Sequence, residues 1–185
     1  MTCALLVTMA GLAGAGGFAA PRVAGAQGAR ATPQAIDPAW LRADSATKTA
    51  QFELVAGLTG LNGALNFNGF RDGGLVLTVP LGWTVVMHFT NHDGDLPHSA
   101  EVTPEAKPLP VGPVPPAFER AYTIKLEQGL QAGQEDDIRF TADRAGDYLI
   151  FCAVPGHGAA GMWIRFRVST TAARPGLATA QGGGS

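Results

Sequence analysis

Cysteine is scarce in this sequence: Cys3 and Cys152 are the two that occur in 185 residues. Two thiols cannot build a disulfide-stapled scaffold, nor can they supply the four thiolates of a structural zinc or iron–sulfur site. The chain must therefore fold around a hydrophobic core, and 46% of its residues are hydrophobic. Its length fits one domain, since a domain takes about 100–200 residues.

Charge is also sparse, because 15% of the residues are charged where about a quarter is usual. Thirteen Lys and Arg residues against fifteen Asp and Glu residues give a net charge of −2. Nucleic-acid binders owe their affinity to clustered basic residues that neutralise phosphates. The chain is therefore not expected to bind nucleic acid.

The N-terminal end has the composition of a targeting segment. Residues 3–21 form an uncharged apolar run, and Ala24-Gly25-Ala26 follows as a small-x-small cleavage pattern. We predict a signal peptide over residues 1–26. The alternative is an uncleaved membrane anchor, which is not favoured because the run is rich in Gly and Ala and weakly hydrophobic for a spanning helix.

Composition divides the rest of the chain into three parts. A polar, Ala-rich stretch precedes the core and a Gly-rich stretch ends the sequence. We predict a linker over residues 27–48 with one short helical turn near Trp40, a compact domain over residues 49–170 and a flexible tail over residues 171–185.

The predicted domain lacks any long apolar period of 3.6 residues, so little helix is expected. Short alternating apolar runs, separated by Gly, Pro, Asn and Asp, are typical of strands in an all-β sandwich or barrel. The runs are FELVAG (52–57), ALNFNG (64–69), LVLTVP (75–80), WTVVMHFTN (83–91), AYTIKLE (121–127), DIRFTA (137–142), DYLIFC (147–152) and MWIRFRV (162–168).

Two further segments have structural signatures. Residues 143–148 resemble a tyrosine corner, in which the Tyr148 hydroxyl bonds to upstream backbone in a Greek-key sandwich. Residues 104–116 hold six prolines and cannot be a central strand, because proline lacks the ladder donor. We expect a stiff surface loop there; a polyproline docking segment is the alternative.

The strongest chemical signal is Cys152, His157 and Met162 at the spacing C-x4-H-x4-M between two predicted strands. A thiolate, an imidazole and a thioether are soft ligands that select copper. A trigonal set of one cysteine and two histidines, with a weak axial methionine, defines a blue-copper site. Taken singly, a buried Cys or Met is more often part of a core, and a Cys–His pair can also be a nucleophile with its base.

A second histidine must come from His88, His92 or His98. His88 lies within a predicted strand and His92 in a polar turn, whereas His98 follows Pro97, which stiffens its approach. We expect His98 to be the ligand, with Asn91 and Ser99 as candidates for hydrogen bonds around the metal.

These motifs resemble the cupredoxins, and within them sulfocyanin, with rusticyanin next. The resembling residues are 66–69, 79–83, 89–91, Leu96-Pro97-His98-Ser99 and 152–163. The resemblance implies a cupredoxin-like Greek-key β-sandwich or barrel. It also implies one type 1 copper ion bound by His98, Cys152, His157 and Met162, with a high reduction potential.

The expected function is the shuttling of single electrons between redox partners, such as a cytochrome or a terminal oxidase, by an exported monomer in the periplasm or outside the cell. An exported copper chaperone or store is the alternative. A copper enzyme is not expected, because its additional sites need histidines and the sequence holds no His-x-His pair.

Overall fold

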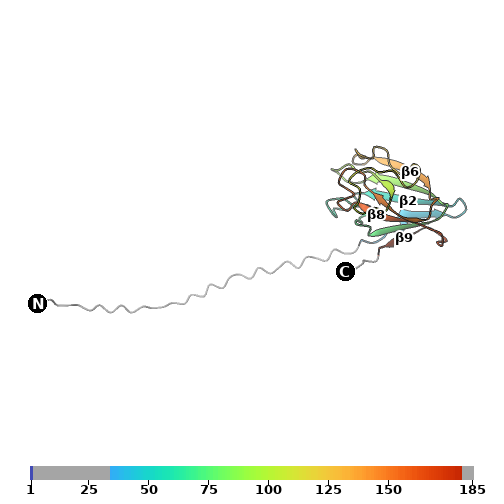
Figure 1. The fold of residues 1–185 in the computed structure, drawn as a ribbon, viewed down its shortest axis with the longest axis horizontal. Coiled ribbons are helices and arrows are strands. Elements are labelled where there is room, and N and C mark those ends of the chain that lie inside the picture. Colours follow the sequence, from blue (N-terminus) through green and yellow to red (C-terminus); the bar gives the residue numbers. More distant parts are fainter. Residues whose placement is uncertain (2–33, 181–185) are drawn as a thin grey trace. The chain divides into compact units, whose positions relative to one another are not determined.

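The structure, a computed structural model, describes Met1 and residues 34–180, so the predicted signal peptide lies outside the described residues except for Met1. Nine strands within these residues form two sheets (Figure 1). The first sheet has the order β1 (Leu41–Asp44), β2 (Thr49–Ala56), β4 (Thr84–Asn91) and β6 (Glu135–Thr141). The second has the order β5 (Glu101–Pro104), β7 (Gly146–Phe151), β8 (Trp163–Ser169), β3 (Leu75–Pro80) and β9 (Gly176–Thr179).

Helix is limited, within the described part of the chain, to the 3-10 turn η1 (Pro38–Trp40), which confirms the turn predicted near Trp40. The predicted all-β sandwich is confirmed. None of the helical structure in this part of the chain has the length and apolar character needed to cross a membrane.

The core lies between the two sheets and follows the alternation of the sequence. In β8, Ile164, Phe166 and Val168 are buried while Arg165 and Arg167 lie on the other face. The hydroxyl of Tyr148 donates to the Arg144 carbonyl at 3.0 Å, which confirms the tyrosine corner.

Two predicted strands are wrong. Residues 64–69 form a turn with isolated bridges, because Ala64, Asn68 and Gly69 have positive φ angles of 65°, 52° and 77°. The Asn68 side chain replaces a ladder here: its Oδ1 accepts from the Val55 N–H at 3.0 Å and its Nδ2 donates to the Glu53 carbonyl at 2.8 Å.

Residues 121–127 make one isolated bridge rather than a strand, since the chain turns at Lys125, where φ is 53°. The Pro-rich segment is a loop, as expected. Pro104 ends β5, which is an edge strand, so its missing N–H costs no ladder bond.

The folded unit is wider than the predicted domain of residues 49–170. Strand β1 falls in the predicted linker and pairs with β2, and β9 falls in the predicted flexible tail and pairs with β3. Both are edge strands whose side chains are mostly exposed. They join the sheets through backbone hydrogen bonds. Because this pairing needs no alternating apolar side chains, the sequence gives no sign of these strands.

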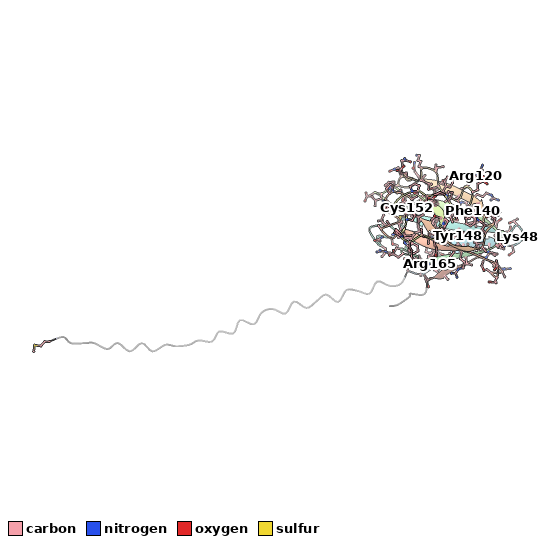
Figure 2. All side chains as sticks on the ribbon, viewed as in Figure 1. Lys48, Arg120, Phe140, Tyr148, Cys152 and Arg165 are labelled. Carbon is pink, nitrogen blue, oxygen red and sulfur yellow. The ribbon has the colours of Figure 1, made fainter. Side chains whose placement is uncertain are left out.

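Strand directions decide which loops meet. In the second sheet β7 is antiparallel to β8, so β7 ends where β8 begins. His98, after β4, contacts Cys152, after β7, so β4 ends at this same end of the sandwich. The segments after β4 and β7 therefore share one end of the sandwich. Lys48, in the turn between β1 and β2, marks the opposite end (Figure 2).

Glu101, the first residue of β5, is a fully buried carboxyl. Its Oε2 accepts from the Val114 N–H of the Pro-rich loop at 3.3 Å, and its Oε1 has no partner. Burial raises the pKa of Glu101 from its ordinary value of 4.5 to about 7, against the opposing effect of the Val114 hydrogen bond. The folded chain thus keeps a proton that the unfolded chain releases.

Glu101→Gln is expected to remove a pH dependence of stability. Between pH 4.5 and about 7, the unfolded chain loses the Glu101 proton while the folded chain holds it. The free energy of unfolding therefore falls as pH rises, by roughly 1–3 kcal/mol in total. Gln still offers an acceptor to Val114 but does not titrate, so the variant should be the more stable protein above pH 7.

Thermal unfolding at several pH values between about 4 and 8 measures this effect. Glu119→Gln is the control, because the Glu119 side chain is 93% exposed, and it should follow the unmodified chain. Parallel stability profiles for Glu101→Gln and the unmodified chain would contradict the prediction.

Candidate metal centre

The predicted metal-binding residues come from two segments at the same end of the sandwich. Cys152 directly follows β7 and Met162 directly precedes β8, so the loop of residues 152–162 joins these two neighbouring strands. His98 lies between β4 and β5 and pairs with Leu130 in an isolated bridge.

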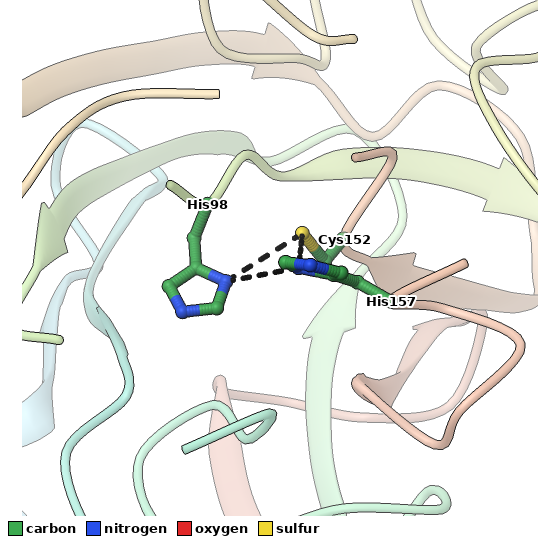
Figure 3. A group of neighbouring side chains, drawn as sticks. All are labelled: His98, Cys152 and His157. Carbon is green, nitrogen blue, oxygen red and sulfur yellow. Dashed lines mark hydrogen bonds between the residues drawn. The ribbon is translucent and has the colours of Figure 1, made fainter. Parts of the chain in front are cut away.

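The structure brings Cys152, His98 and His157 together (Figure 3). The Cys152 Sγ lies 3.9 Å from the His98 Nδ1 and 3.6 Å from the His157 Nδ1, and the two Nδ1 atoms are 3.3 Å apart. Both imidazoles therefore present the same ring nitrogen to the sulfur, and the three donor atoms form a compact triangle.

Backbone hydrogen bonds fix the loop that carries Cys152 and His157. The Cys152 N–H donates to the Met162 carbonyl at 3.0 Å and the Met162 N–H donates to the His157 carbonyl at 3.0 Å. Gly158 is needed here, because a Cβ on it would lie 2.5 Å from the Phe151 ring. The loop is thus held on both sides of His157.

Met162 is fully buried and joins the core. Its backbone bonds to both Cys152 and His157 place the residue beside the triangle. Its role as the axial ligand, which the resemblance implies, stays a prediction.

His98 is mounted on the neighbouring segment by a two-way backbone pair with Leu130, at 3.0 and 2.7 Å. Asn91, at the end of β4, donates from Nδ2 to the carbonyls of Leu96 and Leu130, both at 2.8 Å. Asn91 therefore braces the chain around His98 without contacting a donor atom of the triangle.

Ser99 contacts the thiol directly. Its N–H donates to the Cys152 Sγ at 3.4 Å, and its hydroxyl accepts from the Ala153 N–H at 3.2 Å while donating to the Leu126 carbonyl at 2.7 Å. Ser99 thus ties the His98 segment to the Cys152 loop.

Electrostatics in this pocket disfavour charge on the protein's own donors. Burial raises the pKa of the Cys152 thiol to about 11, and the hydrogen bonds from Ser99 and Val154 only partly offset this. Burial likewise lowers the pKa of His157 and of His98, the latter despite its contact with Asp93. The imidazoles are therefore neutral, with free lone pairs. The Cys152 thiolate would need a cation beside it to be stable in this buried position.

Asp93 contacts His98, and the sequence did not predict this contact. Its Oδ2 lies 2.9 Å from the His98 Nε2, the ring nitrogen facing away from Cys152. Burial opposes ionisation of Asp93, but hydrogen bonds from Asp95, His98 and Leu96 outweigh it and lower the pKa of this carboxyl. The sequence shows two acids in this turn, Asp93 and Asp95, and nothing in its pattern separates them.

The two other histidines lie away from the triangle. The His88 side chain is 39% exposed and pairs with Asp137 of β6, and His92 is exposed at the surface. Neither belongs to the cluster, which contains His98 in their place; that His98 binds the metal stays a prediction.

The triangle has the size that a metal ion needs. Bonds of about 2.0–2.3 Å from nitrogen and sulfur to a first-row metal such as zinc give donor separations of about 3.3–3.8 Å for angles between tetrahedral and trigonal. The separations of 3.3 and 3.6 Å fall within this range, and the 3.9 Å between the Cys152 Sγ and the His98 Nδ1 lies just above it. The donor set, one thiolate and two imidazoles, suits copper.

A β-sandwich with a buried cysteine and two histidines converging at one end defines a cupredoxin, the blue copper class. The sulfocyanin domain matches residues 38–179. The chain belongs to the sulfocyanin family, which confirms the resemblance found in its motifs.

Individual relatives agree with this assignment. The sulfocyanin of Sulfolobus acidocaldarius is 28% identical over 141 residues, which are 71% of this chain and 69% of that protein. A methionine-to-glutamine variant of rusticyanin is 26% identical with a TM-score of 0.52, over 70% of this chain and 87% of that one. Rusticyanin with serine-to-aspartate and methionine-to-leucine changes shares the fold, at 24% identity, a TM-score of 0.51 and coverage of 70% and 86%.

Family and donor set together establish a copper-binding electron-transfer protein whose cofactor is one type 1 copper ion. Substitution of individual residues tests which of them bind the copper.

Cys152→Ser is expected to abolish the intense visible absorption of the Cu(II)-loaded protein, because that band arises from the copper–thiolate bond. His98→Ala should weaken copper binding and alter the band, since the triangle loses one corner. His92→Ala is the matched control and should keep both band and affinity. Optical titration with copper measures all three, and loss of the band in His92→Ala would show that the wrong histidine has been assigned.

Proposed function

We propose that His98, Cys152, His157 and Met162 bind one type 1 copper ion and that the chain shuttles single electrons between redox partners outside the cytoplasm. The observation that carries this proposal is the buried triangle of donor atoms on a braced loop. When bound, the copper ion supplies a one-electron couple between Cu(I) and Cu(II).

The protein's part is to hold the donors still. Fast electron transfer requires little rearrangement between the two oxidation states, and the backbone bonds among Cys152, His157 and Met162 oppose rearrangement. The Leu130 pair does the same for His98. Burial of Cys152 and His98 at 0% exposed keeps water from the thiolate and one imidazole.

His157 gives the centre its contact with the surface, because it is partly exposed whereas Cys152 and His98 are buried. Apolar residues from several loops lie near it. Val111 accepts from Gly156 at 2.7 Å, and Asn62, next to Leu61, donates to Ala160 at 2.9 Å. We call this surface the loop-end face; it comprises Leu61, Leu96, Val111, Pro155, Ala159 and Ala160, all exposed or partly exposed.

The loop-end face suits brief docking of a redox protein such as a cytochrome or a terminal oxidase. Val111 is 66% exposed, Leu61 43% and Leu96 38%, so these three residues present apolar side chains to solvent. Transient redox interfaces are small and must separate quickly. A small apolar surface centred on one imidazole meets both conditions.

A copper chaperone or store is the second candidate, and burial of the donors argues against it, because exchange needs accessible ligands. Within the described residues, no second group of three His, Cys, Asp or Glu side chains is close enough to hold a metal. Membership of the sulfocyanin family supports a carrier rather than a copper enzyme with several centres. Export is supported by the signal-like residues 1–26.

The copper-loaded protein is expected to show a reversible one-electron wave in voltammetry and to retain copper against a chelator, because the donors are buried and braced. A chaperone would instead release its copper quickly to the same chelator. Time courses with a Cu(I) chelator, on the reduced protein, distinguish the two, and rapid release together with an irreversible wave would contradict the carrier.

Ala159→Lys is expected to slow electron self-exchange between oxidised and reduced copies by about tenfold or more, because two like charges meet when loop-end faces approach. Leu81→Lys is the control: Leu81 is 43% exposed and follows β3 at the opposite end of the sandwich. NMR line broadening in mixed samples measures the rate. Equal slowing by both variants would show that the loop-end face is not the docking surface.

A further inference from the structure

A buried carboxylate stands behind one of the proposed copper ligands. Asp93 is 7% exposed and His98 0%, and the Asp93 Oδ2 lies 2.9 Å from the His98 Nε2. The other ring nitrogen of His98, Nδ1, is the one that faces Cys152 and His157. The carboxylate, the imidazole and the donor triangle thus form one continuous chain of contacts.

The carboxylate is held in this position by its own backbone and by its neighbours. Its Oδ1 accepts from the Asp95 N–H at 3.0 Å, and the Asp93 N–H donates to the Asn91 Oδ1 at 2.9 Å. Gly57 makes room for it, since a Cβ at Gly57, where φ is +65°, would lie 2.6 Å from the Asp93 Cβ. Asp93 is therefore built into the fold and is not a surface acid that happens to lie near.

A carboxylate can only accept hydrogen bonds, so the hydrogen of the neutral His98 ring must lie on Nε2. The Nδ1 lone pair is then left facing the sulfur, which is the tautomer that a metal ligand needs. An amide or hydroxyl partner could both donate and accept and would not impose this choice.

The carboxylate also carries a negative charge, one imidazole ring away from the donor triangle, in a buried region. A fixed anion stabilises the more positive of two oxidation states, and the effect is larger where the surroundings are of low dielectric. Asp93 should therefore favour the oxidised form of the centre.

We propose that Asp93 is a positioning residue that fixes the tautomer of His98 and lowers the reduction potential of the copper centre. The proposal rests on the function proposed above, because it takes His98 to be a ligand.

The test compares Asp93→Asn with Asp95→Asn. Both remove one negative charge from the same turn, but the Asp95 side chain is exposed and makes no contact with His98. In Asp93→Asn the ratio of Cu(I) to Cu(II) affinity should rise by about tenfold, which is about 59 mV for a one-electron couple. Asp95→Asn should change it much less. Equal potentials in the two variants would overturn the proposal.

The metal-free, unmodified chain provides a second test that needs no variant to fold. The ¹⁵N shifts of His98, read by long-range proton–nitrogen NMR, should show hydrogen on Nε2 and a bare Nδ1. Hydrogen on Nδ1 would overturn the proposal even if Asp93→Asn does not fold.

The proposed function and the proposed role of Asp93 are contradicted by different results. If the unmodified, copper-loaded chain lacks the blue band, the proposed function fails. If the band is present but Asp93→Asn leaves the potential where Asp95→Asn leaves it, the role of Asp93 alone fails.

Discussion

The hydrogen bond from the Cys152 N–H to the Met162 carbonyl, at 3.0 Å, is the contact on which the centre depends. It continues the β7–β8 ladder by one more pair and so closes a loop in which His157 must turn back toward the sulfur. Because both ends of the loop are joined by this extended ladder, the loop is held as rigidly as the sheet. The loop thereby holds the Cys152 and His157 donor atoms at contact distance.

The second segment is tied to the first by Ser99. One residue bonds to the Cys152 sulfur, the Ala153 backbone and the Leu126 carbonyl, and it directly follows His98. The two sheets of the sandwich supply the two halves of the site, since β4 leads to His98 and β7 leads to Cys152. Ser99 thereby fixes the distance between His98 and Cys152, which come from the two different sheets.

The sequence predicts best where chemistry and spacing coincide. The C-x4-H-x4-M spacing puts Cys152 and His157 on one loop, and Pro97 before His98 marked the third member of the cluster that the structure shows. The edge strands β1 and β9 pair through their backbones and show no apolar alternation in the sequence. Residues 64–69 do alternate as a strand would, but positive φ angles turn the chain there and the Asn68 side chain takes the place of a ladder. The contact between Asp93 and His98 was not predicted, because the space for Asp93 depends on Gly57, which lies far away in the sequence and has no Cβ.

The negative charge of Asp93 changes the net charge of the whole copper centre. With His98 and His157 neutral, the Cys152 thiolate and Asp93 are the two negative charges that the buried contacts define. A bound Cu(II) ion would leave such a centre neutral and a bound Cu(I) ion would leave it one charge negative, whereas without Asp93 the reduced state would be the neutral one. Burial penalises whichever state is charged. The N–H of Ser99 acts in the opposite direction, because it withdraws electron density from the sulfur and so favours the reduced state. If His98 and Cys152 bind the copper, as proposed, the reduction potential would be set by the balance between Asp93 behind His98 and Ser99 at Cys152, six residues apart on one segment of the chain.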